Sequence, residues 1–169
     1  DVRGQEGFYH YRQYSAVDLA TDRPLDDVMR LMIDGALPAT EAERESFAAE
    51  LRPLRPLPAS LLPLLPAIAR TSQPLDGLRT ALSFAAAERG MRPVIDLTPA
   101  QRRADCLFAC AITPTILCAL HRLSVGLEPI APRDDLDAAA NHLWMLTGRE
   151  PSPEHARAIG TYLVSTVDH

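Results

Sequence analysis

The sequence predicts an all-α fold, and three observations lead to this prediction. Apolar residues recur at the spacing of an amphipathic helix from Leu25 to the end of the chain. Most of these segments open with a capping residue or with Pro at the first helical position, and several end at Gly. After the first residues, no run has the period of two that marks a half-buried strand. We therefore expect helices throughout, preceded by a short extended or irregular start.

Two helices are expected in the first third of the chain. The first ends at Gly35 and carries apolar residues on one face, namely Leu25, Val28, Met29, Met32 and Ile33. The second begins at Thr40, which has Glu43 three residues later and so has the spacing of a capping box. This helix should continue through Leu51 until Pro53 interrupts it.

Prolines alternate with leucines between Pro53 and Pro66. Such a segment could be a polyproline ligand, which would be extended and solvated. Its leucines are too apolar to be left in water; they are Leu61, Leu62, Leu64 and Leu65. They favour the alternative, which is a series of short helical turns packed on the core.

A further helix is expected from Pro74, at the first helical position, to the residues before Gly90. Its apolar positions are Leu75, Leu78, Leu82, Ala85 and Ala86. Thr98, Pro99 and Gln101 then give the cap, first-position and capping-box signals of the longest helix. It should run to Gly126 with a kink at Pro114.

The middle of this long helix, residues 109–119, is rich in Ala, Cys and Thr on several faces, so neighbouring helices can approach it closely. We expect residues 102–123 to lie largely inside the structure and to contribute to a two-fold interface. After a loop over residues 127–135, a helix should span 136–147 and end at Gly148. Ser152 and Pro153 open the last helix, whose inward positions are Ala156, Ile159, Leu163 and Val167.

Composition limits the function classes. With 169 residues, 47% of them hydrophobic, the chain can form one domain or one large piece of a domain. A net charge of −5 and the lack of a basic block argue against nucleic acid as a partner. Apolar stretches are broken by Pro or charge, and the start lacks a signal-peptide layout, so we expect a cytoplasmic protein without a membrane span. The start at Asp1 and the end at His169, without a helix-ending signal, suggest truncation at both ends.

The three cysteines lie in one apolar segment, at Cys106, Cys110 and Cys118. An odd number within one helix cannot build a disulfide framework, so reduced thiols are expected. Cys106 and Cys110, with His121 further along, could be imagined as a metal site. Most of their neighbours are Ala, Leu, Ile and Phe, which favours a role as small buried residues.

Standard catalytic motifs are absent from the sequence, including a Gly-rich phosphate loop, Cys-x-x-Cys, His-Glu-x-x-His and Gly-x-Ser-x-Gly. Candidate residues are therefore isolated ones. His10 lies among Phe8, Tyr9, Tyr11 and Tyr14, where ring packing in a hairpin is favoured over stacking on a base or cofactor. His121 and Arg122 end a buried helix and should pair or reach solvent there, whereas His142 and His155 fall on faces expected to be exposed.

The last two residues, Asp168 and His169, form the most interesting pair. A histidine beside a carboxylate at the end of an amphipathic helix can hold a defined tautomer and offer a hydrogen-bond donor to an anionic ligand. The alternative is a packed histidine without a functional role, and spacing alone does not decide between the two.

Five stretches of the chain form a series in a fixed order. They are Tyr11-Arg12-Gln13-Tyr14, the run from Pro74 to Thr80, Pro114-Thr115-Ile116 followed by Arg122 and Gly126, the run from Ala138 to Gly148, and Asp168-His169. This series resembles the citrate synthase family over nearly the whole chain. Gln13 stands where many members have Gly, and Gln73 where many have His, which bears on the subgroup.

The resemblance implies an enzyme that condenses oxaloacetate with acetyl-CoA, or with propionyl-CoA in the methylcitrate branch. Members are homodimers of mostly helical subunits and use no metal or redox cofactor. Asp168-His169 looks like the family's Asp-His pair, whose histidine binds oxaloacetate in the cleft between a large and a small domain. The resemblance therefore makes His169 the expected substrate-binding residue.

On this resemblance, residues 1–169 are part of the large helical domain, without the small domain. The family's catalytic groups lie in a Gly-Pro-x-His-Gly segment, a later His and a later Asp, all expected beyond His169, so no catalytic residue is assigned here. The chain alone should be inactive. Two alternatives remain, which are a 2-methylcitrate synthase and a non-catalytic helical assembly module with the same fold.

Overall fold

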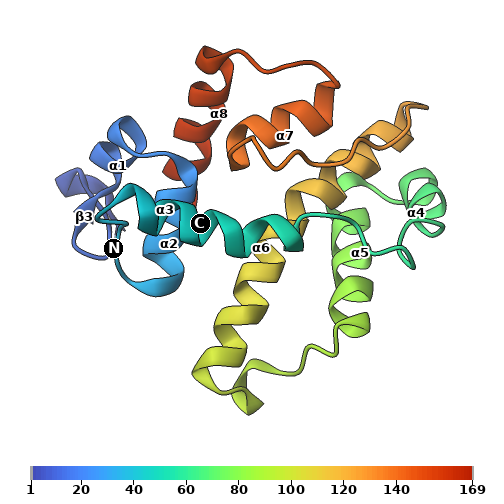
Figure 1. Cartoon of the computed structure of the whole chain (residues 1–169), viewed down its shortest axis with the longest axis horizontal. Coiled ribbons are helices and arrows are strands. Elements are labelled where there is room, and N and C mark those ends of the chain that lie inside the picture. Colours follow the sequence, from blue (N-terminus) through green and yellow to red (C-terminus); the bar gives the residue numbers. More distant parts are fainter. Residues whose placement is uncertain (1, 169) are drawn as a thin grey trace. The chain divides into compact units, whose positions relative to one another are not determined.

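The computed structural model describes residues 2–168, and over that range the chain is predominantly helical, as predicted (Figure 1). By its contacts the chain divides into two compact units. The first unit comprises Asp1–Ala49, Asp135–Ala140 and Pro151–His169. The second comprises Glu50–Asp134 and Asn141–Glu150. Each unit is described by itself.

The first unit begins with the expected extended start. It contains strands β1 (Val2–Arg3), β2 (Phe8–Tyr11) and β3 (Tyr14–Ser15), joined in antiparallel order β1-β2-β3, and the 3₁₀ helix η1 (Gly4–Glu6). The β2–β3 turn holds Arg12 at a φ of 53°, a left-handed conformation that is uncommon for a side chain other than Gly. The Arg12 guanidinium donates to Leu31 O at 2.9 Å and to Met32 O at 3.0 Å. These hydrogen bonds hold the turn against the last part of the helix that ends at Asp34.

Three helices follow in this unit, α1 (Ala16–Asp22), α2 (Leu25–Asp34) and α3 (Glu41–Leu51), which continues into the second unit. Helix α2 ends at Gly35 as predicted, with φ at 88°. Helix α1 was not predicted, because the sequence was expected to be irregular up to residue 25. A signal for it exists, since Ser15 Oγ accepts from Asp18 N at 3.3 Å and thus caps the helix.

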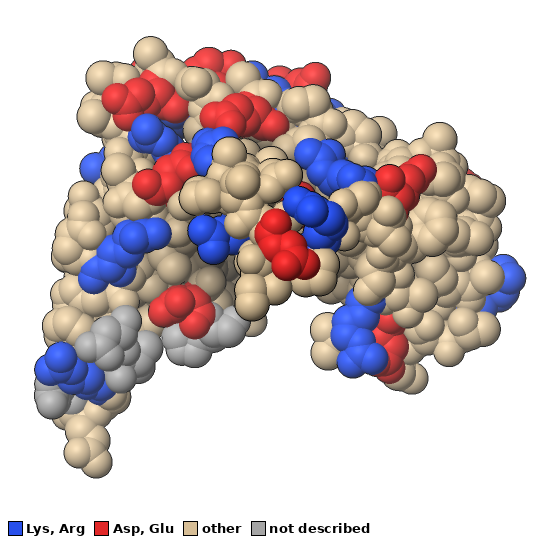
Figure 2. Space-filling model, turned by 90° about the horizontal axis from the view of Figure 1, so that it is seen from below, with Lys and Arg blue, Asp and Glu red and all other residues tan. Residues whose placement is uncertain are grey.

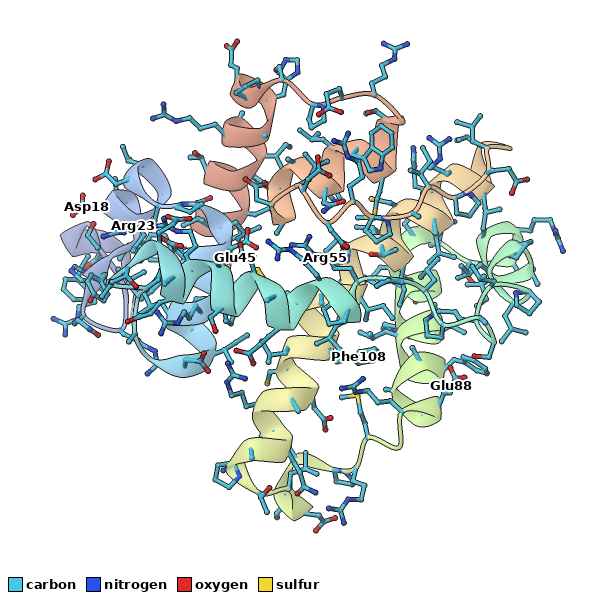
Figure 3. All side chains as sticks on the ribbon, in the orientation of Figure 1. Asp18, Arg23, Glu45, Arg55, Glu88 and Phe108 are labelled. Carbon is cyan, nitrogen blue, oxygen red and sulfur yellow. The ribbon has the colours of Figure 1, made fainter. Side chains whose placement is uncertain are left out.

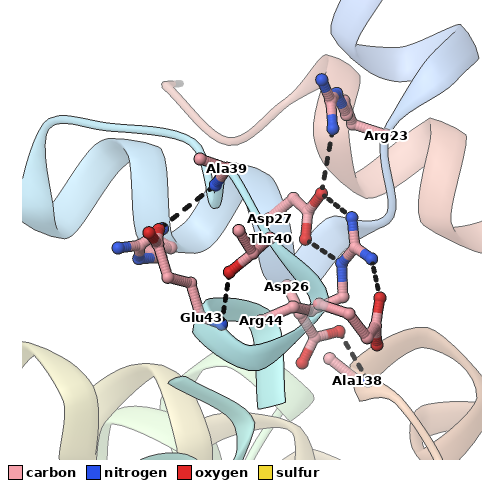
Figure 4. A network of polar contacts seen from close by, with 10 residues as sticks. Arg23, Asp26, Asp27, Ala39, Thr40, Glu43, Arg44 and Ala138 are labelled. Carbon is pink, nitrogen blue, oxygen red and sulfur yellow. Dashed lines mark hydrogen bonds and ion pairs between the residues drawn. The ribbon is translucent and has the colours of Figure 1, made fainter. Parts of the chain in front are cut away.

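The start of α3 forms only half of the predicted capping box. Thr40 Oγ1 accepts from Glu43 N at 3.2 Å, as expected (Figure 4). The Glu43 carboxylate, however, accepts from Ala39 N at 3.2 Å and from Arg30 Nη1 at 2.8 Å, where a full box would use the N–H of Thr40. These two donors hold the pKa of Glu43 below its ordinary value.

Two adjacent carboxylates in the first turn of α2 connect three helices (Figure 4). Asp27 is 1% exposed and accepts from Arg44 on α3 at 2.8 and 3.0 Å, a two-point pair that raises the pKa of Arg44. Asp26 Oδ2 accepts from Ala138 N at 3.0 Å. Ala138 is the first residue of α7 (Ala138–Thr147), so Asp26 adds a distant acceptor to the local cap of that helix, in which Asp137 Oδ1 accepts from Ala140 N at 2.7 Å.

The last helix of the first unit is α8 (Pro153–Ser165), which packs against α1 and α2. Ser152 caps its start as predicted, since Ser152 Oγ accepts from His155 N at 3.2 Å. The buried residues of this unit's core are Tyr11, Ala16, Leu19, Val28, Leu31 and Val164. Tyr11 is the largest of these side chains, and it brings the strands into the helical core.

The second unit is built around α6 (Pro99–Ser124), against which α4 (Leu65–Thr71) and α5 (Pro74–Glu88) pack. The short helices η2 (Arg52–Leu54) and η3 (Val94–Asp96) precede α4 and α6. The buried core residues are Leu61, Leu65, Ala81, Ala85, Phe108, Ile112, Ile116, Ala119 and Leu120. Phe108 belongs to this core (Figure 3), and the guanidinium of Arg89 lies 4.5 Å from the centre of its ring.

Three expectations for this unit are confirmed and two need correction. Thr98 and Gln101 form the full capping box, α6 runs uninterrupted through Pro114, and the Pro-rich segment forms short turns and a helix. The kink at Pro114 stays a prediction. Leu61 and Leu65 are fully buried, but Leu62 and Leu64 are 47% and 39% exposed, because successive residues of a helical turn face different sides. Leu75 is likewise 67% exposed in the first turn of α5.

By length and composition alone, helix α6 could cross a membrane, since 18 of its residues have a mean hydropathy of 1.6, but half of these residues are buried. Its contacts with α4 and α5 are those of a core helix.

On the face seen in Figure 2, acidic and basic side chains are interspersed and leave no broad area of one sign.

The loop before α7 is held by polar contacts to that helix. Asn141 exchanges hydrogen bonds with the backbone of Arg133, at 2.8 and 2.6 Å. Trp144 Nε1 donates to Ala131 O at 3.0 Å, and the Arg133 guanidinium lies 5.2 Å from the centre of the tryptophan ring system. Helix α7 then ends at Gly148, as predicted, with φ at 71°.

Candidate functional site

The end of α8 leads directly to the Asp168-His169 pair. The helix ends at Ser165, and Asp168 is exposed in the turn that directly follows, close to the helix end where the pair was expected. The helix ends early because Thr166 leaves the helical conformation, with φ at −121° and ψ at 6°. His169 lies outside the described residues.

Two tyrosines of strand β2 reach this helix end. Tyr11 OH donates to Val164 O at 2.7 Å, and Tyr9 OH donates to Ser165 O. The two hydroxyl oxygens lie 2.6 Å apart. Burial, together with the neighbouring Tyr9, raises the pKa of Tyr11 well above its ordinary value, so the phenol keeps its proton at any physiological pH.

This contact was not predicted from the sequence. Tyr9 and Tyr11 were interpreted as ring packing within a hairpin, and ring packing is present: His10 stacks on Phe8 with centroids 3.9 Å apart, and the rings of Tyr9 and Tyr11 meet edge to face. The available signal was their i, i+2 spacing, which places both side chains on one face of a strand. Their acceptors are 156 and 153 positions away, beyond the reach of a local pattern.

A second candidate is a cavity of about 410 Å³ within the second unit. It is lined mainly by apolar residues of α4, α5, α6 and α7, with Gln73, His121, Ser124 and His142 among the polar ones. His142 is half-buried, which corrects the prediction that it is exposed, because α7 turns this face toward α6. Burial lowers the pKa of His142, so the neutral imidazole is favoured.

Cys118 is the buried thiol beside this histidine, with Sγ 3.5 Å from His142 Nδ1. Burial raises the pKa of Cys118 to about 12. Because a thiolate is the nucleophilic form, this cysteine is inert at neutral pH. The cavity therefore offers neutral polar groups and apolar walls, which can bind a ligand but do not supply an activated nucleophile.

The other two cysteines do not have the predicted environment. Cys106 and Cys110 are exposed, because they lie on the face of α6 opposite its buried residues, and all three thiols are free. Within the described range, no group of three or more His, Cys, Asp and Glu side chains could hold a metal ion. The expected role as small buried residues thus holds for Cys118 alone.

Arg122 is paired at the end of α6, as predicted. Its guanidinium donates to Glu128 O at 2.6 Å and to Leu146 O at 3.1 Å, which fixes the loop after α6 and the end of α7. Its neighbour His121 is exposed at the rim of the cavity, and His155 is exposed in the first turn of α8, as expected.

Comparison with known proteins gives a consistent result. The family model described as "Citrate synthase, C-terminal domain" matches residues 1–169. A citrate synthase from Deinococcus radiodurans is 33% identical over 168 residues, which are 99% of this chain and 44% of that protein. A 2-methylcitrate synthase from Mycobacterium tuberculosis is 34% identical over 159 residues, which are 94% of this chain and 39% of that protein.

The fold is similar as well. The crystal structure of a citrate synthase from Pyrobaculum aerophilum matches with a TM-score of 0.80 at 30% identity, covering 94% of this chain and 41% of that chain. The chain thus spans less than half the length of these relatives.

Proposed function

This chain belongs to the citrate synthase family, and on that premise we propose that its protein condenses oxaloacetate with acetyl-CoA to give citrate and free CoA. The observation that carries the proposal is the family match over residues 1–169, which ends at the Asp168-His169 pair. The protein forms a homodimer and needs neither a metal nor a redox cofactor. His169 binds oxaloacetate as a hydrogen-bond donor.

The chemistry explains what such a protein must supply. The methyl group of a thioester is a very weak acid, so a carboxylate base removes its proton while a histidine stabilises the enol that forms. The enol carbon attacks the ketone carbon of oxaloacetate, and water then cleaves the thioester to release CoA. The groups that we assign to this chain bind and orient oxaloacetate, and the base and the acyl-CoA site belong to other segments of the family's sequence.

Two alternatives remain, and a specific observation supports the first. The similarity to a 2-methylcitrate synthase from Mycobacterium tuberculosis supports an enzyme of that kind, which would use propionyl-CoA. The second alternative, a helical assembly module without catalysis, stays a prediction from the sequence. The pocket residues that select the acyl group are not assigned in this chain, so the family match alone does not separate citrate from 2-methylcitrate synthesis.

The test is the release of free CoA thiol by the complete protein, measured with oxaloacetate and either acetyl-CoA or propionyl-CoA at equal concentration. We expect a higher kcat/KM with acetyl-CoA. A higher value with propionyl-CoA would move the protein to the methylcitrate branch. Failure to release thiol from either thioester, by a folded protein, would leave the assembly module as the correct assignment.

A further inference from the structure

The end of α8 is closed by hydroxyl groups. An α-helix leaves its last four carbonyls without a hydrogen-bond donor inside the helix. Commonly, backbone N–H groups around a Gly that follows the helix, or water molecules, donate to these carbonyls. Here each of the four carbonyls at residues 162–165 accepts from a side-chain hydroxyl, and two of them also accept from the backbone, Leu163 O from Thr166 N at 3.2 Å and Val164 O from Val167 N at 3.4 Å. The donors are Ser165 to Tyr162 O, Thr166 to Leu163 O, Tyr11 to Val164 O, and Tyr9 to Ser165 O.

The two tyrosines make this closure rigid. Ser165 and Thr166 are part of the segment that they cap, so they move with it, whereas Tyr9 and Tyr11 anchor it to the hairpin. Tyr11 is 1% exposed in the core of the first unit, where its ring packs with Val164. A donor that is itself buried and packed fixes the position of its acceptor better than one on a mobile surface.

The hydroxyls act as a pair, because three contacts share two hydrogens. Tyr9 OH and Tyr11 OH each reach a carbonyl, and their oxygens also lie 2.6 Å apart. Since each phenol has a single hydrogen to donate, removing one hydroxyl leaves one phenol hydrogen for two carbonyls, of which Val164 O keeps its contact with Val167 N. The remaining hydroxyl can still serve one of them, so a full loss of the anchor requires both substitutions.

Only Thr166 and Val167 separate this anchor from the Asp168-His169 pair. We propose that Tyr9 and Tyr11 are positioning residues for Asp168-His169, and that they hold the backbone from which this pair meets oxaloacetate. The inference rests on the proposed function, in which His169 binds that substrate.

The test uses the complete protein and the double variant Tyr9→Phe/Tyr11→Phe, which keeps both rings and removes both hydroxyls. We expect the KM for oxaloacetate to rise about tenfold, because a small displacement of a binding group costs one to two orders of magnitude in rate or affinity. The KM for the acyl-CoA, measured at saturating oxaloacetate, should stay within about twofold. Tyr14→Phe is the matched control, since Tyr14 lies on β3 opposite Tyr11 and its hydroxyl makes none of the hydrogen bonds found among residues 2–168.

Repeating the measurement in the His169→Ala variant distinguishes a failure of this inference from a failure of the proposed function. His169→Ala should raise the KM for oxaloacetate, and adding the two Phe substitutions to it should raise that KM no further, because the tyrosines act through His169. An unchanged KM in His169→Ala would overturn the role of His169 itself and the inference with it. A raised KM in His169→Ala beside an unchanged one in the tyrosine variant would overturn the inference alone.

A general structural effect of the tyrosine substitutions can also be distinguished from a positioning effect. If the double variant raised the KM for both substrates equally, the tyrosines would have a general structural role, and the inference would be overturned. The same conclusion would follow if the two Phe substitutions raised the oxaloacetate KM as much in the His169→Ala background as in the native protein. If the double variant does not fold, Tyr9→Phe provides the same readouts, because Tyr9 is only half-buried and Tyr11 OH remains available. A smaller rise confined to the oxaloacetate KM is then expected.

Discussion

Helices α7 and α8 end in two different ways. At the end of α7, Gly148 adopts a φ of 71° and its N–H donates to Trp144 O at 2.8 Å, so the closure involves neighbours in the sequence. At the end of α8, two of the four last carbonyls accept from tyrosines more than 150 positions earlier. The first closure is a property of a short segment, and the second exists only once the fold has formed. The comparison suggests that a helix end can be placed either by its own sequence or by a distant element.

The largest effect should come from the glycine closure. Gly148→Ala places a Cβ at a positive φ and 2.9 Å from Ile130 Cδ1, so the side chain of Ile130 must move. We expect the free energy of unfolding to fall by about 2 kcal/mol, of which about half is backbone strain. Denaturant unfolding of the complete protein measures it.

Gly126→Ala is the matched control, because Gly126 has a φ of 77° and a Cβ added there would meet nothing within 4 Å. Its free energy of unfolding should fall by the backbone strain alone, about 1 kcal/mol. Equal losses in the two variants would mean that the contact with Ile130 has no energetic weight.

The tyrosine closure should have an intermediate effect on stability. Tyr11→Phe leaves the Val164 carbonyl buried without its hydroxyl donor, and we expect a loss of about 1.5 kcal/mol in the free energy of unfolding. Tyr14→Phe, on the neighbouring strand, should change it by less than about 0.5 kcal/mol. A stability of Tyr11→Phe equal to that of Tyr14→Phe would show that Val167 N, 3.4 Å from the same carbonyl, is sufficient.

The smallest effect should come from a local cap at the other end of α8. Ser152→Ala removes the oxygen that accepts from His155 N, which should cost about 1 kcal/mol. Ser152→Thr keeps a hydroxyl at the cap and should retain most of the stability. Thermal unfolding of both variants at one pH checks this, and equal melting temperatures would exclude a contribution from the cap.

The difference between local and distant hydrogen-bond partners also explains which parts of the fold could be predicted from the sequence. Starts marked by Ser152 or by Thr98 with Gln101, and ends marked by Gly35 or Gly148, lie where they were expected, because each signal acts within one helical turn. The cap of α7 by Asp26 was not predicted, since its partner is 112 positions away. Helix α1 was missed although Ser15 gives a local signal.

Burial was predicted less well than helix position. Leu75 and Cys106 are apolar or weakly polar residues on helices that exist as expected, yet both are exposed. Periodicity gives the apolar face of a helix but not which neighbours cover it. The candidate site has the same limit, because the motif series pointed to Asp168-His169, whereas the tyrosines beneath that turn belong to a strand from the opposite end of the chain.

The aromatic residues are divided between the units in a way that has an optical consequence. Trp144, the single tryptophan, lies in the second unit against the loop at Ala131, whereas the four tyrosines all lie in the first unit. Indole fluorescence excited at wavelengths where phenol does not absorb therefore reports on the loop and α7 alone. Phenol absorbance in the near ultraviolet, which changes when a buried hydroxyl reaches water, reports on the hairpin and α8. The native chain thus carries a separate spectroscopic reporter for each unit without any added label.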